Sequence, residues 1–300
     1  MKLWLAFALA AVLAALTLDA AKAQNEVATR SAIEYADHDG TKLTGDLYLP
    51  KGVAKAPLII AVHGGGWQNG SPAAYKHWGS FLAKNGYGLF AINYRLGKPG
   101  IYPRAVYDVK AAIQFARAKA ADLGIDPDRI GLFGDSAGGH LVSLVGLAGD
   151  QFSSKYRDDP YAATPAQVKT IISFYGVYDM LAQWQHDQIA RPRDQITEKF
   201  LGFSPMENRR IYFDSSPISY ATVDRNRARF LLVNGTTDDI VDPAQAQAFW
   251  TALNEARIYA RRIVIPGAGH FFASDPFENE PTSYGAIAAP RILLFLEGGL

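Results

Sequence analysis

The sequence holds 300 residues, of which 49% are hydrophobic and 20% charged, and it contains no cysteine. The formal net charge of +1 argues against a nucleic-acid-binding protein, which needs a strongly basic face. The absence of cysteine excludes a disulfide framework, so the fold must be stable through its hydrophobic core alone. A single α/β domain is ordinary for a chain of this size.

The first 23 residues have the features of a secretory signal peptide. Lys2 precedes an apolar stretch over residues 3–18, and an A-x-A cleavage pattern ends at Ala23. We therefore expect cleavage after Ala23, export to the periplasm or the medium, and a mature domain over residues 24–300. The apolar stretch is short for a bilayer span, which needs about 20 residues, so no stable membrane anchor is predicted.

The rest of the chain alternates between strand and helix patterns. Alternating apolar and polar residues over 28–49, around Asp39-Gly40, predict an antiparallel hairpin. Continuous apolar runs predict strands that are covered on both faces, at residues 58–62, 89–93, 130–133, 171–174, 230–233 and 263–265. Helical patterns lie between or after them, at residues 73–84, 105–123, 137–147, 244–256 and 283–296. This order predicts an α/β fold with a mostly parallel central sheet, helices on both faces and an N-terminal antiparallel hairpin.

Two local signals refine this arrangement. Asp126-Pro127 is typical of a turn from helix to strand. The stretch from about residue 180 to 222 has no strand pattern and mixes aromatic residues with arginine, proline and aspartate. A long insertion in a compact domain is often a lid over a site. A helical excursion that packs its aromatic residues onto the core fits the pattern equally well.

A Gly-x-Ser-x-Gly sequence, with Ser136 at its centre, lies between the predicted strand at 130–133 and the predicted helix at 137–147. In that setting the glycines permit a sharp, strained turn, from which the serine hydroxyl projects as a nucleophile. The alternative is a glycine-rich turn whose serine only caps the helix. A nucleophilic serine needs a base, and the base needs a carboxylate that orients it.

The predicted base is one of three histidines that follow the serine. His270 comes after the apolar run at 263–265 and a Pro-Gly-Ala-Gly turn, at the carboxyl end of a strand. A doubly wound sheet carries its functional groups there. His140 lies in the predicted helix and is expected to cap or pack, and His186 lies in the insertion and is expected at the surface. His270 is therefore the predicted general base.

The acid is expected after another strand, between the serine and the base. Residues 230–233 lead into a loop with three aspartates. Asp242 precedes a proline and is expected to cap the following helix. Asp238 and Asp239 are adjacent, so both cannot face the same histidine, and the residues alone leave these two nearly equal.

The segment His63-Gly64-Gly65-Gly66-Trp67 follows the first long predicted strand. Glycines at this position let backbone N–H groups approach the oxyanion of a tetrahedral intermediate. The predicted oxyanion donors are the N–H groups of Gly65, Gly66 and Ala137, and His63 is expected to brace the loop. Aromatic residues flank these loops, and Trp67 and Phe271 are the candidate substrate contacts among them; the others are Tyr75, Trp78 and Phe272.

Several segments together resemble a known family; they are residues 63–67, 93–96, 102–103, 108–112, 124–130 and 134–140. The chain is similar to the α/β-hydrolase serine esterases, and within them to the feruloyl-esterase-like and hormone-sensitive-lipase-like carboxylesterases. The resemblance implies an α/β-hydrolase fold and metal-independent ester hydrolysis without a cofactor. It also implies Asp238 as the acid, four residues after Asn234. The chain departs from the family at Asn234, where many relatives have histidine, and at Asp239-Ile240, where others have Pro-Val.

These features predict a serine hydrolase that cleaves carboxylic esters through an acyl-enzyme. The expected partner is a small-molecule ester, such as an acetylated or feruloylated sugar, and not a nucleic acid. An arylformamidase or a peptidase would use the same triad on amide bonds. A non-catalytic binding protein with a hydrolase fold is a third alternative, which the complete set of catalytic groups disfavours.

Overall fold

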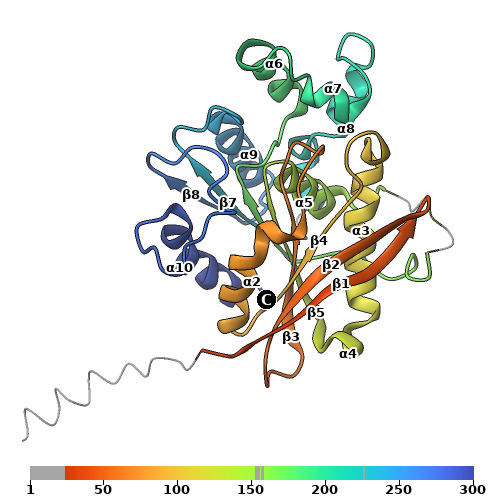
Figure 1. The fold of residues 1–300 in the computed structure, drawn as a ribbon. Coiled ribbons are helices and arrows are strands. Elements are labelled where there is room, and N and C mark those ends of the chain that lie inside the picture. Colours follow the sequence, from red (N-terminus) through yellow and green to blue (C-terminus); the bar gives the residue numbers. More distant parts are fainter. Residues whose placement is uncertain (1–23, 153–155, 157–158, 226) are drawn as a thin grey trace, which may run out of the picture.

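The computed structural model describes residues 24–152, 156, 159–225 and 227–300, so the predicted signal peptide over residues 1–23 lies outside it. The described residues form an eight-stranded sheet in the order β1-β2-β4-β3-β5-β6-β7-β8 (Figure 1). The strands are β1 (Val27–His38), β2 (Thr41–Pro50), β3 (Ala56–Val62), β4 (Gly88–Ile92), β5 (Ile125–Asp135), β6 (Thr170–Phe174), β7 (Arg229–Gly235) and β8 (Ala260–Ile265).

The pairing of the strands confirms the predicted sheet. β1 and β2 form an antiparallel hairpin, and β2 is also antiparallel to β4. All pairs from β4 through β3 to β8 are parallel. The parallel strands therefore present their carboxyl ends, and the loops that follow them, along one edge of the sheet.

Helices cover both faces of this sheet (Figure 1). α3 (Arg104–Ala118), α5 (Ala137–Ala148) and α9 (Pro243–Glu255) contribute to one hydrophobic core, and α2 (Lys76–Lys84) and α10 (Tyr284–Glu297) to a second. Successive side chains of a strand point to opposite faces. Thus Ile60 of β3 lies in the first core and its neighbour Ile59 in the second. The fully apolar runs follow from this two-sided burial.

Two predicted helices and one predicted turn differ from the structure by more than a residue at an end. The helix predicted at 73–84 begins as a 3-10 turn, η1 (Pro72–Tyr75), before α2. The helix predicted at 105–123 is divided into α3 and the short α4 (Ala120–Leu123). The turn into β5 is made by Gly124, whose φ is +76°, and not by Asp126-Pro127. Asp126 instead accepts a hydrogen bond from the N–H of Asp128 within an irregularity of β5.

The stretch over residues 180–222 contains no strand, as predicted. It folds into α6 (Met180–Ala190), α7 (Ile196–Leu201), α8 (Arg209–Asp214) and the 3-10 turn η3 (Pro217–Tyr220). The first three lie together at the top of Figure 1, away from the hairpin. Phe200 and Tyr212 are buried, whereas Phe203 and Phe213 are about half exposed. Part of the insertion therefore packs on the body of the protein. None of the described helices is long and apolar enough to cross a membrane.

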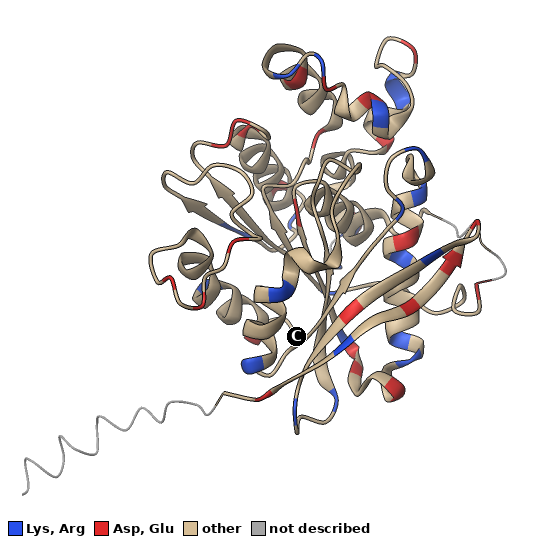
Figure 2. Ribbon diagram, viewed as in Figure 1, with Lys and Arg blue, Asp and Glu red and all other residues tan. Residues whose placement is uncertain are grey.

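Three of the inner strands have no charged residue. β3, β4 and β6 contain no charged residue, and charged side chains of both signs lie on the hairpin, the helices and the loops (Figure 2). A buried cluster of charged and polar side chains joins β1, the loop after β4 and α3. The Arg95 guanidinium binds the carboxylate of Asp108, with 2.7 Å from Nη2 to Oδ1. Asp108 also accepts the N–H of Arg95 and a hydrogen bond from His38 at 2.7 Å.

We expect the substitution Asp108→Ala to lower the free energy of unfolding by about 3–5 kcal/mol, because it leaves the buried Arg95 without its main counter-charge. The matched control is Glu26→Ala, which breaks the exposed Glu26–Lys51 pair. That substitution is expected to leave stability unchanged, since solvent screens an exposed ion pair. Urea denaturation measures both. Similar unfolding midpoints for the two variants would contradict the structural role of the buried pair.

Candidate active site

Ser136 lies in a strained turn between the end of β5 and the start of α5. Its backbone has φ +51° and ψ −118°, a conformation that is unfavourable for a residue with a side chain. The flanking glycines are required by close packing. A Cβ on Gly134 would lie 2.4 Å from the carbonyl oxygen of Gly138, and one on Gly138 would lie 1.8 Å from the carbonyl oxygen of Val62. The strand–turn–helix setting predicted for the Gly-x-Ser-x-Gly sequence is therefore present.

The structure brings Ser136, His270 and Asp238 together. His270 Nε2 lies 2.9 Å from Ser136 Oγ, and His270 Nδ1 lies 2.7 Å from Asp238 Oδ2. The side chains of His270 and Asp238 are each only 1% exposed. With an ionised carboxylate, Nδ1 carries the proton and Nε2 is free to accept the serine proton. This is the geometry of a nucleophile, a general base and an orienting acid.

The three aspartates of the loop after β7 have different environments. Asp238 is buried, and its second carboxylate oxygen accepts the N–H groups of Ile240 and Val241 at 3.0 and 2.9 Å. Asp239 is exposed, and its carboxylate makes no hydrogen bond with His270. Asp242 accepts the N–H of Ala244 and caps α9. The structure thus separates the two neighbouring aspartates that the residues alone left nearly equal.

Two other histidines have structural contacts. His140 is fully buried, binds the carbonyl oxygen of Ser215 at 2.7 Å, and accepts the indole N–H of Trp67. Burial lowers the pKa of His140 to about 4, so this ring is neutral near pH 7. His63 is buried, stacks on Tyr94, and bonds the carbonyl oxygen of Gly64 at 2.8 Å. Both side chains brace the loops around the site.

The expectation that His186 is simply a surface residue is incomplete. Its ring is only partly exposed, and its Nε2 lies 2.9 Å from the backbone oxygen of Asp239. This contact joins α6 to the loop that carries Asp238. No periodic pattern in the sequence indicates this contact, because it depends on how the insertion packs.

Glycines shape the candidate oxyanion loop. Gly65 and Gly66 have φ of +109° and +60°, and a Cβ on Gly65 would lie 2.2 Å from the backbone oxygen of Asn69. The N–H groups of Gly65, Gly66 and Ala137 donate no hydrogen bond to another described residue. All three residues line one cavity with Ser136 and His270. The cavity therefore offers free backbone donors beside the serine, as an oxyanion hole requires.

Asp135 is a residue of the site that the sequence analysis did not identify. Its carboxylate accepts the N–H of Gly64 at 2.9 Å and the hydroxyl of Tyr75 at 2.7 Å. Burial raises the pKa of Asp135, and these two hydrogen bonds oppose that shift. The side chain thus ties the residue before the nucleophile to the glycine loop. Its place directly before Ser136 was the available signal.

The cavity has a volume of about 240 Å³ and both apolar and polar walls. Trp67 and Phe271, the predicted substrate contacts, both line it. Phe271 is 59% exposed, whereas Trp67 is almost fully buried and stacks on Phe200. The other flanking aromatic residues belong to the core and do not line it; they are Tyr75, Trp78 and Phe272. Further lining residues that the sequence did not indicate are Asn69, Val177, Gln183, Arg191, Asp194, Ile196, Ile240 and Val241.

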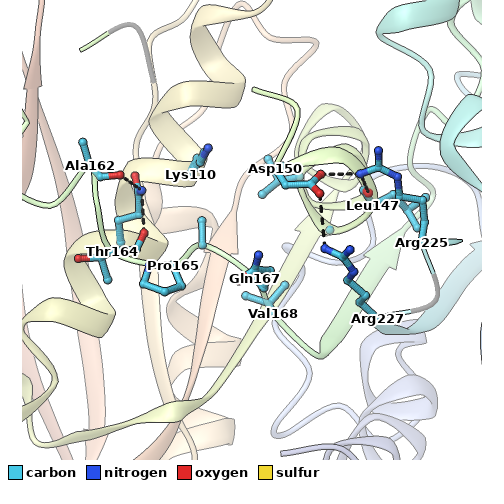
Figure 3. A pocket seen from close by; sticks show the side chains of 15 residues that line it. Lys110, Leu147, Asp150, Ala162, Thr164, Pro165, Gln167, Val168, Arg225 and Arg227 are labelled. Atoms are coloured by element: carbon cyan, nitrogen blue, oxygen red, sulfur yellow. Dashed lines mark hydrogen bonds and ion pairs between the residues drawn. The ribbon is translucent and has the colours of Figure 1, made fainter. Parts of the chain in front are cut away.

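Another cavity, of about 210 Å³, lies at the far end of α5 from the serine and includes Leu147 and Gly149 in its lining (Figure 3). Its charged groups are occupied by other protein groups. Figure 3 shows the Asp150 carboxylate between the guanidinium groups of Arg225 and Arg227. Neither Ser136, His270 nor Asp238 lines this cavity. Among the described residues there is also no group of three histidine or carboxylate side chains placed to hold a metal ion.

Comparison with known proteins places the chain among esterases. The closely related sequences include esterase LipC and the probable carboxylic ester hydrolase LipM, both of Mycobacterium tuberculosis H37Rv. LipC is 32% identical over 72% of this chain and 53% of its own length, and LipM is 30% identical over 79% and 54%. The chain thus spans about half the length of these relatives.

The solved structures with a similar fold include a truncated form of a carbohydrate esterase from gut microbiota. It is 25% identical, its TM-score is 0.75, and the match covers 93% of this chain and 98% of that one. An esterase of Thermogutta terrifontis has the same fold, with 24% identity, a TM-score of 0.70 and 90% of each chain covered. The family model of BD-FAE matches residues 45–253, a segment that includes Ser136 and Asp238. The chain therefore belongs to the BD-FAE family and has the α/β-hydrolase fold of esterases.

Proposed function

We propose that this protein is a carboxylic ester hydrolase that works through a serine acyl-enzyme. The observation that carries the proposal is the continuous hydrogen-bond chain from Ser136 through His270 to Asp238, at the wall of a cavity with unpaired backbone donors. The relatives named above are esterases, which supports ester rather than amide substrates. The amide-cleaving alternative has no comparable support.

In the proposed reaction, each step uses one of the groups described above. His270 Nε2 takes the Ser136 proton as Oγ attacks the ester carbonyl, and Asp238 holds the ring orientation and stabilises the imidazolium. The N–H groups of Gly65, Gly66 and Ala137 stabilise the oxyanion. The imidazolium returns its proton to the leaving alkoxide, and the alcohol departs. Water, deprotonated by His270, then attacks the acyl-enzyme, releases the carboxylic acid and restores the serine.

We expect Ser136→Ala to lower kcat/KM on p-nitrophenyl acetate by at least about 10⁴-fold, because no nucleophile remains. The matched control is Ser80→Ala on α2, which is expected to retain wild-type activity. Equal rates for wild type and Ser136→Ala would exclude the proposal. An N-formyl aromatic amide serves as the competing substrate, and a higher kcat/KM on this amide than on the ester would favour an arylformamidase.

The two adjacent aspartates provide a sharp test of the acid. We expect Asp238→Asn to lower kcat by about 10³–10⁴-fold, because an amide in this position favours the wrong tautomer of His270. Asp239→Asn is expected to leave kcat unchanged, since that side chain is exposed. Steady-state kinetics on the same ester compares them. A larger loss from the change at Asp239 would reverse the assignment.

We also propose that the protein is exported and that residues 1–23 are removed. The support is the apolar stretch at 3–18 and the cleavage pattern that ends at Ala23. Expression of the full chain in a bacterial host should give a periplasmic or secreted protein that begins at Gln24. Intact-mass spectrometry of each cell fraction measures this. An uncleaved chain confined to the cytoplasm would contradict the proposal.

The proposed natural substrates are small or plant-derived esters, such as acetylated or feruloylated sugars. The structural neighbour described as a carbohydrate esterase supports this class. A panel of acetylated and feruloylated sugars, with simple alkyl esters as the reference, ranks them by kcat/KM.

A further inference from the structure

One polar wall of the active-site cavity comes from the insertion. Arg191 and Asp194 lie in the connection between α6 and α7, and both line the cavity that contains Ser136 and His270. Most of the other lining side chains outside the catalytic cluster are apolar; they include Val177, Ile196, Ile240 and Val241. Two opposite charges therefore stand in an otherwise mainly apolar enclosure.

Arg191 is held in place by groups that do not use all of its donors. Its Nη2 donates to Asp187 Oδ1 at 2.6 Å and to the backbone oxygen of Ile240 at 3.0 Å. Asp187 is buried, and it also accepts the amide of Gln183 at 2.9 Å. The Nη1 of Arg191 makes no hydrogen bond with a described residue. The guanidinium is thus pre-oriented; its Nε is buried without a partner among the described residues, and its Nη1 remains for a ligand.

The side chain of Asp194, in contrast, is not held by other described residues. Its side chain is exposed and makes no hydrogen bond or ion pair within the part of the chain that the structure describes. Its backbone N–H binds the carbonyl oxygen of Arg191 at 2.9 Å, which keeps the two residues in one turn. The carboxylate is therefore an acceptor at the cavity that no donor of a described residue occupies.

We propose that Arg191 and Asp194 are specificity-determining residues that bind hydroxyl groups of the substrate, beside the ester that Ser136 attacks. A hydroxyl both donates and accepts, so it can bind the guanidinium and the carboxylate at once. A substrate carboxylate would be attracted by Arg191 but repelled by Asp194 and Asp187. The inference rests on the proposed ester hydrolysis, and it narrows the substrates to esters that carry neighbouring hydroxyl groups.

The insertion is also fastened to the loop that bears Asp238. His186 binds the backbone oxygen of Asp239 at 2.9 Å, and Gln183 binds that of Ile240 at 2.9 Å, in addition to the bond from Arg191. Removal of Arg191 would therefore disturb this loop as well as the subsite. Asp194 is the better position for a test, because its side chain binds no other described residue.

The test compares Asp194→Ala and Arg191→Ala with wild type on two matched pairs of esters. Propyl acetate and glycerol 1-acetate differ only by two hydroxyl groups on the alcohol, and ethyl propanoate and ethyl 2,3-dihydroxypropanoate differ only by two hydroxyl groups on the acyl chain. We expect wild type to have the lower KM for the dihydroxy member of one pair. Each variant should raise that KM by about tenfold, as the loss of a hydrogen bond to a charged group does. The pair that responds shows which side of the ester the subsite binds.

The control variant is Arg193→Ala, which removes an exposed arginine that does not line the cavity and should alter neither KM. If Asp194→Ala changes plain and dihydroxy esters equally, or changes neither, the inference is wrong. A preference for acetoxyacetate, whose alcohol carries a carboxylate, would also overturn it. In each of these cases Ser136-dependent hydrolysis of propyl acetate would persist, so failure of the inference is distinct from failure of the proposed function.

Discussion

The backbone conformation of Ser136 is the constraint on which the site depends. A residue with a side chain in this region of φ and ψ costs about 1–3 kcal/mol and persists only where its surroundings enforce it. Here the N–H of Ser136 donates to the backbone oxygen of Phe174 on β6 at 2.9 Å, and Gly138 packs against the end of β3. The central strands therefore hold the turn from both sides. Packing of these strands thus fixes the position of the Ser136 hydroxyl group.

The partners of that hydroxyl come from the loops after β7 and β8. Because these strands are parallel to β5, their carboxyl ends reach the same edge of the sheet. Two backbone N–H groups then fix the carboxylate of Asp238, and the aromatic ring of Tyr175 packs 4.4 Å from the imidazole of His270. The insertion adds hydrogen bonds to the acid loop and supplies part of the cavity wall. The same segment thus contacts both the cavity and the loop that carries Asp238.

Much of this arrangement is predictable from the sequence where the signal is local. The strand β3 has an apolar run because both its faces are buried. The glycines on either side of Ser136 are required because a Cβ at these positions would lie only 1.8 or 2.4 Å from a backbone oxygen. Asp238 and Asp239 are harder, because they are the same residue type at the same strand end. Only the path of the loop decides which carboxylate turns inward.

Contacts made by the insertion were not predictable for a related reason. Arg191, Gln183 and His186 bind backbone oxygen atoms of residues about 50 positions away, and such partners leave no trace in hydrophobic periodicity. The turn into β5 differs from the prediction because Asp-Pro is a common turn signal, whereas the chain turns at Gly124, which has a positive φ. Sequence patterns thus located the elements that bury apolar surface, and they were silent on polar contacts between distant loops.

The most direct measurement is to identify the residue that becomes covalently modified. A reactive phosphonate ester that traps serine nucleophiles is incubated with the full enzyme, and tandem mass spectrometry locates the adduct. The account predicts one adduct per chain, on the hydroxyl of Ser136, with loss of ester hydrolysis in proportion to labelling. An adduct on another residue, or full labelling of Ser136 with hydrolysis intact, would contradict it.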